Sequence, residues 1–154
     1  MNISTKGRYG LRAMLEMALQ EREGPVSLNL IAQRQGLSER YLEQLMLLLK
    51  SAGLIKSVRG SQGGYLLAKR PEDMKVGDIV RALEGPVAPV SCVNEECPED
   101  CIRENVCVTR QVWAKVRDAV SETLDSITLG DLVSKSMMQT ASEQNKKETI
   151  ASNI

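Results

Sequence analysis

Apolar residues recur at helical spacing through the first fifty residues of the chain. An amphipathic helix is predicted over residues 5–20, where apolar side chains fall at i, i+3, i+4 and i+7: Leu11, Met14, Leu15 and Ala18. A second, short helix is expected between Ser27 and Gly36. Ser27 is a favoured N-cap residue, and Gly36 can take the left-handed conformation that ends a helix.

A third helix is predicted from its N-cap, Ser38, to Gly53, with a buried apolar stripe formed by Leu42, Leu45, Met46 and Leu49. The opposite face carries Arg40, Glu43 and Gln44. Two short helices joined by a Gly-containing turn are typical of a helix-turn-helix, whose second helix enters the DNA major groove. A small helical bundle uses similar turns, so the pattern alone leaves a bundle without a DNA role as an alternative.

The stretch VRGSQGGYLLA, residues 58–68, indicates a β-hairpin directly after the third helix. Two short apolar runs flank a glycine-rich loop formed by Arg59, Gly60, Ser61, Gln62, Gly63 and Gly64. A hairpin in this position is a wing. Arg59 can enter a minor groove, whose negative potential attracts guanidinium, and the glycines leave backbone N–H groups uncovered for phosphate.

The second half of the chain is predicted to be mainly helical around one irregular segment. A helix from Val76 to Leu83 stops at Gly85 and Pro86. A heptad-like apolar stripe then follows on a helix of about twenty residues: Trp113, Val116, Val120, Leu124 and Ile127. Such a stripe suits either dimerisation or packing onto the chain's own domain. Thr128 and Asp131 resemble a capping box for a last short helix, and residues 137–154 are expected to be a disordered tail.

Charge is distributed unevenly along a chain whose net charge is zero. Residues 1–70 hold 11 Lys and Arg against 5 Asp and Glu, a net of +6, and residues 71–154 hold 9 against 15, a net of −6. A basic half favours an anionic partner, although a merely solvated charged surface is the alternative.

The absence of His, of a P-loop and of a nucleophile elbow argues against an enzyme. Without an apolar run long enough for a membrane span or an apolar leader segment, we expect a cytoplasmic protein.

All four cysteines fall in one acidic segment, at the spacing C-x4-C-x3-C-x5-C: Cys92, Cys97, Cys101 and Cys107. In a cytosolic chain this clustering favours metal or cluster binding over disulfides. Structural zinc sites usually show paired knuckles, whereas iron–sulfur clusters tolerate longer loops, so iron–sulfur is the preferred interpretation. The surrounding carboxylates predict unreactive thiols when no metal is bound.

Five blocks make the sequence resemble the IscR-type winged-helix regulators, a family with relatives NsrR and CymR. They are TKGRYGLRAML, IAQRQGLSERYLEQLMLLLKSAGLI, VRGSQGGYLLA, VGDIVRALEG and the cysteine segment. The resemblance covers roughly residues 1–135. It implies a homodimer joined through the long C-terminal helix and a cluster held by Cys92, Cys101 and Cys107. It also implies that Ser38 and Tyr41 bind phosphate while Arg40, Glu43 and Gln44 reach bases.

The resemblance leaves the fourth cluster ligand open. The family's ligating His corresponds to Arg110 here, and the acidic ligand of NsrR-like members corresponds to Arg8. Cys97 is therefore the first candidate and Glu104 the second, with 2Fe–2S preferred to 4Fe–4S.

These observations predict a mainly α fold: a winged helix-turn-helix with a two-stranded wing, a cysteine loop and a long C-terminal dimerisation helix. The expected divisions are 1–85 for DNA binding, 86–107 for the cysteine loop, 108–136 for the dimerisation and terminal helices, and 137–154 for the tail. The expected function is a dimeric transcription regulator that binds double-stranded promoter DNA, is controlled by an iron–sulfur cluster, with 2Fe–2S favoured, and regulates cluster-assembly genes. The alternatives are a nitric-oxide or redox sensor of the same family, and a small zinc or electron-transfer protein with no DNA role.

Overall fold

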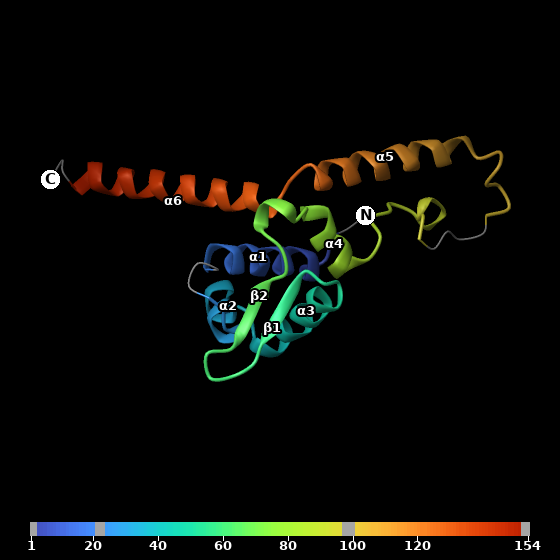
Figure 1. Ribbon diagram of the computed structural model, residues 1–154. Helices are drawn as coiled ribbons and strands as arrows, with labels where there is room; N and C mark the ends of the chain where they lie inside the picture. The colour runs from blue at the N-terminus through green and yellow to red at the C-terminus, as the bar shows by residue number, and fades with distance from the viewer. Residues whose placement is uncertain (1–2, 21–23, 97–100, 152–154) are drawn as a thin grey trace.

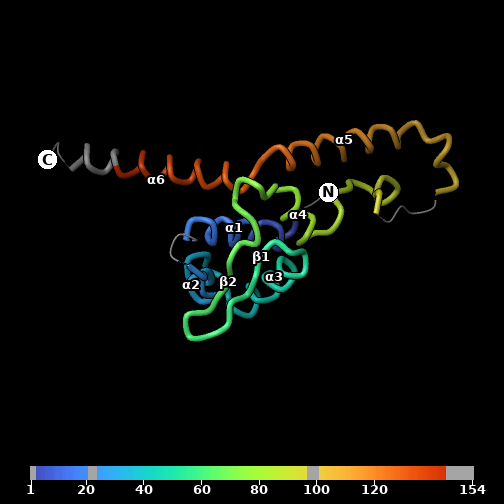
Figure 2. Tube along the Cα trace, in the orientation of Figure 1, coloured from blue at the N-terminus to red at the C-terminus, as the bar shows by residue number. Residues whose placement is uncertain are grey.

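The computed structural model describes residues 3–20, 24–96 and 101–151. Its fold is the predicted mainly helical winged helix-turn-helix, with one two-stranded antiparallel sheet in the described part. Helices α1 to α4 and the hairpin form one globular unit (Figure 1). Helices α5 and α6 run along one side of this unit, and the hairpin loop projects from the opposite side (Figures 1 and 2).

The first three helices follow the predicted local signals closely. They span Thr5–Gln20 (α1), Leu28–Gln35 (α2) and Glu39–Ser51 (α3). The Ser27 hydroxyl accepts the N–H of Leu30 at the start of α2, and Gly36 ends that helix in the left-handed conformation at φ +64°. The predicted stripe of α3 is buried at every position: Leu42, Leu45, Met46 and Leu49.

The buried face of α1 differs from the prediction. Met14 is buried as expected, whereas Leu11, Leu15 and Ala18 are only partly buried. The other buried residues of α1 are Gly7, Gly10, Ala13, Glu16 and Met17. The reason is a close approach by α4 (Val76–Glu84), because a Cβ on Gly10 would lie 2.3 Å from a Leu83 methyl carbon. Because glycines line this contact, they are the residues of α1 that face α4. The large apolar residues of the predicted stripe are therefore turned partly away from the core.

Strands β1 (Ile55–Val58) and β2 (Gly64–Leu67) pair antiparallel, from Ile55 opposite Leu67 to Val58 opposite Gly64. The loop end of β2 is held to the segment before α2 by two backbone hydrogen bonds of 2.9 Å between Val26 and Tyr65. The predicted wing is therefore joined directly to the helix-turn-helix.

Helix α4 is also tied to the start of α1 and to the end of the helix Val108–Asp125 (α5). The Glu84 carboxylate accepts the N–H of Ser4 at 3.0 Å and that of Gly7 at 2.7 Å, so it caps α1 from α4. Arg81 of α4 also donates to Asp125, the last residue of α5, at 2.7 Å. Backbone bonds from Val76 to Ile127 and from Leu129 to Met74 close the same junction.

The C-terminal part consists of α5 (Val108–Asp125) and α6 (Leu129–Ala151), after the short helices η2 (Pro71–Asp73) and η3 (Ser91–Val93). The capping box is confirmed, since the carboxylate of Asp131 accepts both the N–H and the hydroxyl of Thr128 at 2.9 Å.

The predicted disordered tail over 137–154 is contradicted as far as Ala151, because α6 continues to that residue as helix. After Gly130 this helix contains neither Gly nor Pro and many good helix formers, so local propensity carries it onward without an apolar stripe. No helix in the described ranges is long and apolar enough to cross a membrane.

Candidate nucleic-acid interface and cysteine segment

The N-terminal half of α3 presents the polar face that the sequence predicts. Ser38 caps the helix through its hydroxyl, which accepts the N–H of Tyr41 at 3.3 Å. Arg40, Glu43 and Gln44 are all exposed and lie on the face opposite the buried stripe. The fold thus brings four of the five predicted α3 residues together on one open surface.

Tyr41 is the exception, since it is half-buried between α3 and α1. Its hydroxyl donates to the Thr5 hydroxyl at 3.2 Å, and its ring meets that of Tyr9 edge to face, with ring centres 6.3 Å apart. These contacts place the start of α1 beside the start of α3. A phosphate contact by Tyr41 therefore has to share the hydroxyl with Thr5.

The start of α1 adds positive charge that the sequence reasoning missed as part of this surface. The guanidinium groups of Arg8 and Arg12 lie 5.6 Å and 5.5 Å from the centre of the Tyr9 ring. Both arginines are exposed, although Arg12 also donates to Gln35 at 2.8 Å. The amphipathic pattern of residues 5–20 marks these positions as solvent-facing, but only the Tyr9–Tyr41 contact shows that they adjoin α3.

The loop between β1 and β2 carries the predicted wing residues at the far end of the hairpin (Figure 2). Arg59, Gly60, Ser61 and Gln62 are exposed, and Gly63 is half-buried. Gly60 adopts φ +116°, which favours glycine, and its carbonyl accepts the Gly63 N–H at 3.0 Å. The Gly63 N–H is therefore used inside the turn, so it is not uncovered for phosphate as the sequence reasoning expected.

Lys50 connects this hairpin to α3, because its ammonium group donates to the Ser57 hydroxyl on β1 at 2.7 Å. The α3 face is consequently fixed to the hairpin that carries the wing loop, and Arg40, Lys50 and Arg59 are exposed on these two elements. Such a surface suits an anionic, extended partner.

The cysteine segment lies at the other end of the molecule, between α4 and α5. Cys92 is on η3 and half-buried, Cys101 is exposed in the following turn, and Cys107 is the N-cap residue of α5. Cys97 lies outside the described residues. Within the described part, no three His, Cys, Asp or Glu side chains are gathered closely enough to hold a metal ion.

The pKa of Cys107 shifts in the direction opposite to the one that its acidic surroundings predict. A hydrogen bond between its sulfur and the Thr109 hydroxyl, at 3.2 Å, is the main cause that lowers the pKa of Cys107, and the Arg110 backbone N–H adds to it. The prediction counted charges along the sequence and overlooked the hydrogen-bond donors at the start of α5.

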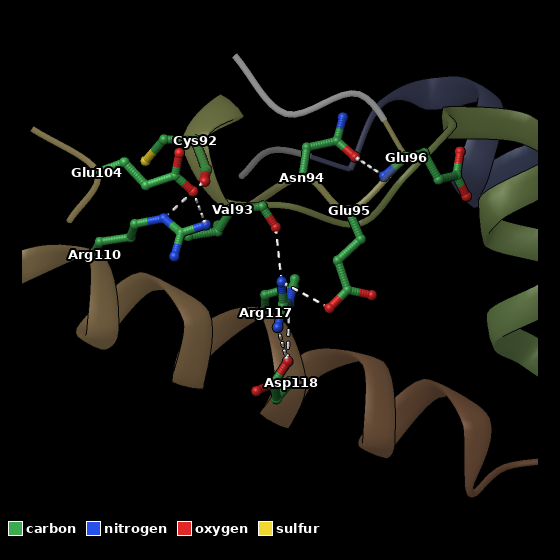
Figure 3. Close-up of polar contacts among 9 residues, drawn as sticks. All are labelled: Cys92, Val93, Asn94, Glu95, Glu96, Glu104, Arg110, Arg117 and Asp118. Atoms are coloured by element: carbon green, nitrogen blue, oxygen red, sulfur yellow. Dashed lines mark hydrogen bonds and ion pairs between the residues drawn. The ribbon is translucent and has the colours of Figure 1, made fainter. Parts of the chain in front are cut away.

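Two arginines of α5 hold the beginning of the cysteine segment against this helix (Figure 3). Arg110 donates to the Cys92 carbonyl at 3.2 Å and pairs with the Glu104 carboxylate at 3.0 Å. Arg117 donates to the Val93 carbonyl at 2.9 Å and pairs with Glu95 at 3.0 Å. Glu104, the second candidate for the fourth ligand, is therefore engaged by Arg110.

Known proteins resemble this chain over most of its length. The profile of the Rrf2 family, described as an iron-dependent transcriptional regulator, matches residues 3–135. The transcriptional regulator CymR of Bacillus subtilis (strain 168) is 52% identical over 134 residues, which cover 87% of this chain and 91% of CymR.

Two solved structures share the fold. One is the structure of CymR, the global cysteine regulator of B. subtilis, with a TM-score of 0.74 and 49% sequence identity. The match covers 88% of this chain and 98% of the CymR chain. The structure of T. potens IscR has a TM-score of 0.71 at 51% identity and covers 88% of each chain.

Proposed function

The chain belongs to the Rrf2 family of transcriptional regulators, and on that premise we propose that it is a cytoplasmic, homodimeric repressor that binds promoter DNA. One observation carries the proposal: α3 exposes a polar face with Arg40 and Gln44, and the Lys50–Ser57 bond holds this helix to β1 of the hairpin that carries the exposed wing loop. The relatives are regulators of transcription and not enzymes, which agrees with the sequence.

In the proposed complex, the N-terminal half of α3 lies in the major groove and the wing reaches the adjoining minor groove. Ser38 and Tyr41 would contact phosphates. Arg40 would donate to guanine and Gln44 would pair with adenine, while Glu43 would accept from the amino group of cytosine. Arg59 would enter the minor groove, with Gly60, Ser61, Gln62 and Gly63 as the narrow loop that admits it.

A homodimer is proposed because α5 has no buried residue in the single chain. Its C-terminal half packs against α4, but its N-terminal half exposes Val112, Trp113 and Val116, of which Val112 is 55% exposed. Exposed apolar side chains at helical spacing are typical of a helix that pairs with a second copy. Two copies would place two α3 helices for reading a two-fold symmetric site.

Control by an iron–sulfur cluster is the finer part of the proposal. The donor chemistry fits, because three described cysteines share one surface segment and the pKa of Cys107 is lowered toward the ligating thiolate form. The described arrangement does not gather them, so ligation would require the segment to rearrange. Cys92, Cys101 and Cys107 would hold a 2Fe–2S cluster, with Cys97 as the proposed fourth ligand. A bound cluster would supply an inorganic centre sensitive to iron supply, nitric oxide and oxidants, and cluster-assembly genes would be the regulated set.

A second candidate has its own support, because CymR is described as a global cysteine regulator and is as similar to this chain as the solved IscR is. In that case the chain would regulate genes of cysteine metabolism and the ungathered cysteines would need no cluster.

Anaerobic purification followed by iron, sulfide and zinc analysis separates these candidates. The cluster proposal expects about two irons and two sulfides per chain, lost in Cys92→Ala; colourless protein with neither would overturn it.

DNA binding is tested separately with duplexes selected from a random pool. Gln44→Ala and Arg59→Ala should weaken binding, whereas the matched α6 variants Gln139→Ala and Lys135→Ala should not. If the α6 variants weaken DNA binding as much as Gln44→Ala and Arg59→Ala do, the proposal that α3 and the wing contact DNA is wrong.

A further inference from the structure

Leu47 breaks the polar character of the exposed face of α3. It is 64% exposed, more than any other large apolar side chain among the described residues of α1 to α4 and the hairpin. Leu47 follows Gln44 by three residues and Glu43 by four, so all three lie on the same side of the helix. It therefore stands within the face proposed to read bases.

The surroundings of Leu47 connect it to the wing. A hollow of about 380 Å³ lies between α3 and β2, and its lining includes Arg40, Glu43, Gln44, Leu47, Lys50 and Tyr65. Lys50, which is held by Ser57 of β1, forms one cationic side of this hollow and Arg40 forms another. An occupant of the hollow thus meets an apolar side chain between two positive charges.

This combination matches the chemistry of one component of duplex DNA. The floor of the major groove is polar except for the methyl group on C5 of thymine, and the phosphates that flank the groove are anionic. A protein partner would also cover Leu47, but it would have to match two cations and a carboxylate, and a duplex already fits the adjoining face and wing. Continuity with that surface makes DNA the favoured occupant.

We propose that Leu47 is a specificity-determining residue that contacts the C5 methyl group of a thymine. The inference rests on the proposed DNA-binding function. Four helical residues rise about 6 Å, so the thymine should lie within about two base steps of the base read by Glu43. Burying one methyl group predicts a loss of roughly fourfold in affinity when the methyl is removed.

The test replaces each thymine of a selected operator, one at a time, by deoxyuridine, which differs only by that methyl group. Affinities of the full-length protein are measured by fluorescence anisotropy for wild type, Leu47→Ala and Leu48→Ala. Leu48 is the matched control, since it is the next leucine along, is 38% exposed and does not line the hollow. One position should show about a fourfold loss for wild type and Leu48→Ala and no loss for Leu47→Ala.

Uridine effects that are the same in all three proteins, or absent at every position, would overturn the role of Leu47 while leaving DNA binding intact. Failure of the wild type to prefer any duplex sequence would overturn the DNA-binding function and this inference together. Thermal unfolding of Leu47→Ala should match wild type, because the replaced side chain is largely exposed.

Discussion

Replacing Gly64 by alanine tests whether the wing is fixed to the helix-turn-helix by backbone contact. A Cβ on Gly64 would lie 2.4 Å from the Val26 carbonyl oxygen and 2.6 Å from its carbonyl carbon. Both are backbone atoms and cannot rotate aside, so Val26 and β2 have to separate. Their separation would break the two 2.9 Å hydrogen bonds between Val26 and Tyr65.

Two backbone hydrogen bonds at about 1 kcal/mol each set the expected loss at about 2 kcal/mol in the free energy of unfolding. That is a large part of the roughly 5–15 kcal/mol of a typical domain, and it corresponds to a fall of about 4–8 °C in Tm. Urea unfolding followed by circular dichroism measures the first quantity, and calorimetry measures the second. Affinity for a selected duplex should fall as well, because the wing loses its fixed position beside α3.

Two other variants separate this cause from general effects of substitution in the hairpin. Gly60→Ala meets no atom within 4 Å but has φ +116°, so about 1 kcal/mol of backbone strain is expected. Ser61→Ala is exposed and should leave stability unchanged. If Gly64→Ala unfolds within about 0.5 kcal/mol of wild type, the wing is not held by this contact and the reasoning is wrong.

Glu43→Ala should widen the set of duplexes recovered in a binding selection, because a carboxylate facing DNA is unfavourable unless a cytosine amino group compensates it; an unchanged or narrower set would contradict this role. Val116→Asp puts a charge on the exposed apolar side of α5 and should convert a dimer into a monomer in sedimentation velocity, and a persistent dimer would exclude that face. Arg117→Ala removes the donor to the η3 carbonyl and should speed amide hydrogen exchange around η3 without lowering the global Tm; unchanged exchange would show that this contact does not hold the segment. Hydrogen bonds from Thr128 lower the pKa of Asp131, so its contribution is complete above the unfolded pKa and is lost as the pH falls through the folded pKa. Asp131→Asn should therefore flatten the acid limb of stability against pH, and an identical limb would refute the capping role.

Local signals in the sequence predicted the first half of the fold well. Ser27, Gly36 and Ser38 act within one turn of their own positions, so a single sequence is enough to place α2 and α3. The core face of α1 was not predictable in this way. It depends on the contact between Gly10 and Leu83, which lies on a helix more than seventy residues later. The spacing of apolar residues within α1 does not show which later helix packs against it.

The cysteine segment shows the same division between spacing and arrangement. The spacing identified one short segment that holds every cysteine, but it could not show that Arg110 engages Glu104 and the Cys92 carbonyl. The carboxylates near Cys107 in the sequence predict a raised pKa, but hydrogen bonds from the Thr109 hydroxyl and the Arg110 backbone lower the pKa of this thiol. Counting charges along the chain ignores such directional contacts.

A continuous series of contacts joins the cysteine segment to the recognition surface. Arg117 holds η3 to α5, and Asp125 at the end of α5 meets Arg81 of α4. Glu84, one turn later on α4, caps α1. The start of α1 then reaches α3 through the hydrogen bond between Thr5 and Tyr41.

The strengths of these contacts decide which of them fixes α5 in place. The Arg81–Asp125 pair is about one-third exposed on both sides, so screening by water limits it to roughly 0–1 kcal/mol. The backbone bonds from Val76 to Ile127 and from Leu129 to Met74, at about 1 kcal/mol each, are at least as strong and are not screened by salt. The position of α5 relative to α4 is therefore set mainly by the backbone, whereas the grip of the basic surface on phosphates weakens steeply with salt. A signal from the cysteine segment can alter DNA binding only by favouring a second arrangement at this junction, because a row of contacts with a single arrangement transmits nothing.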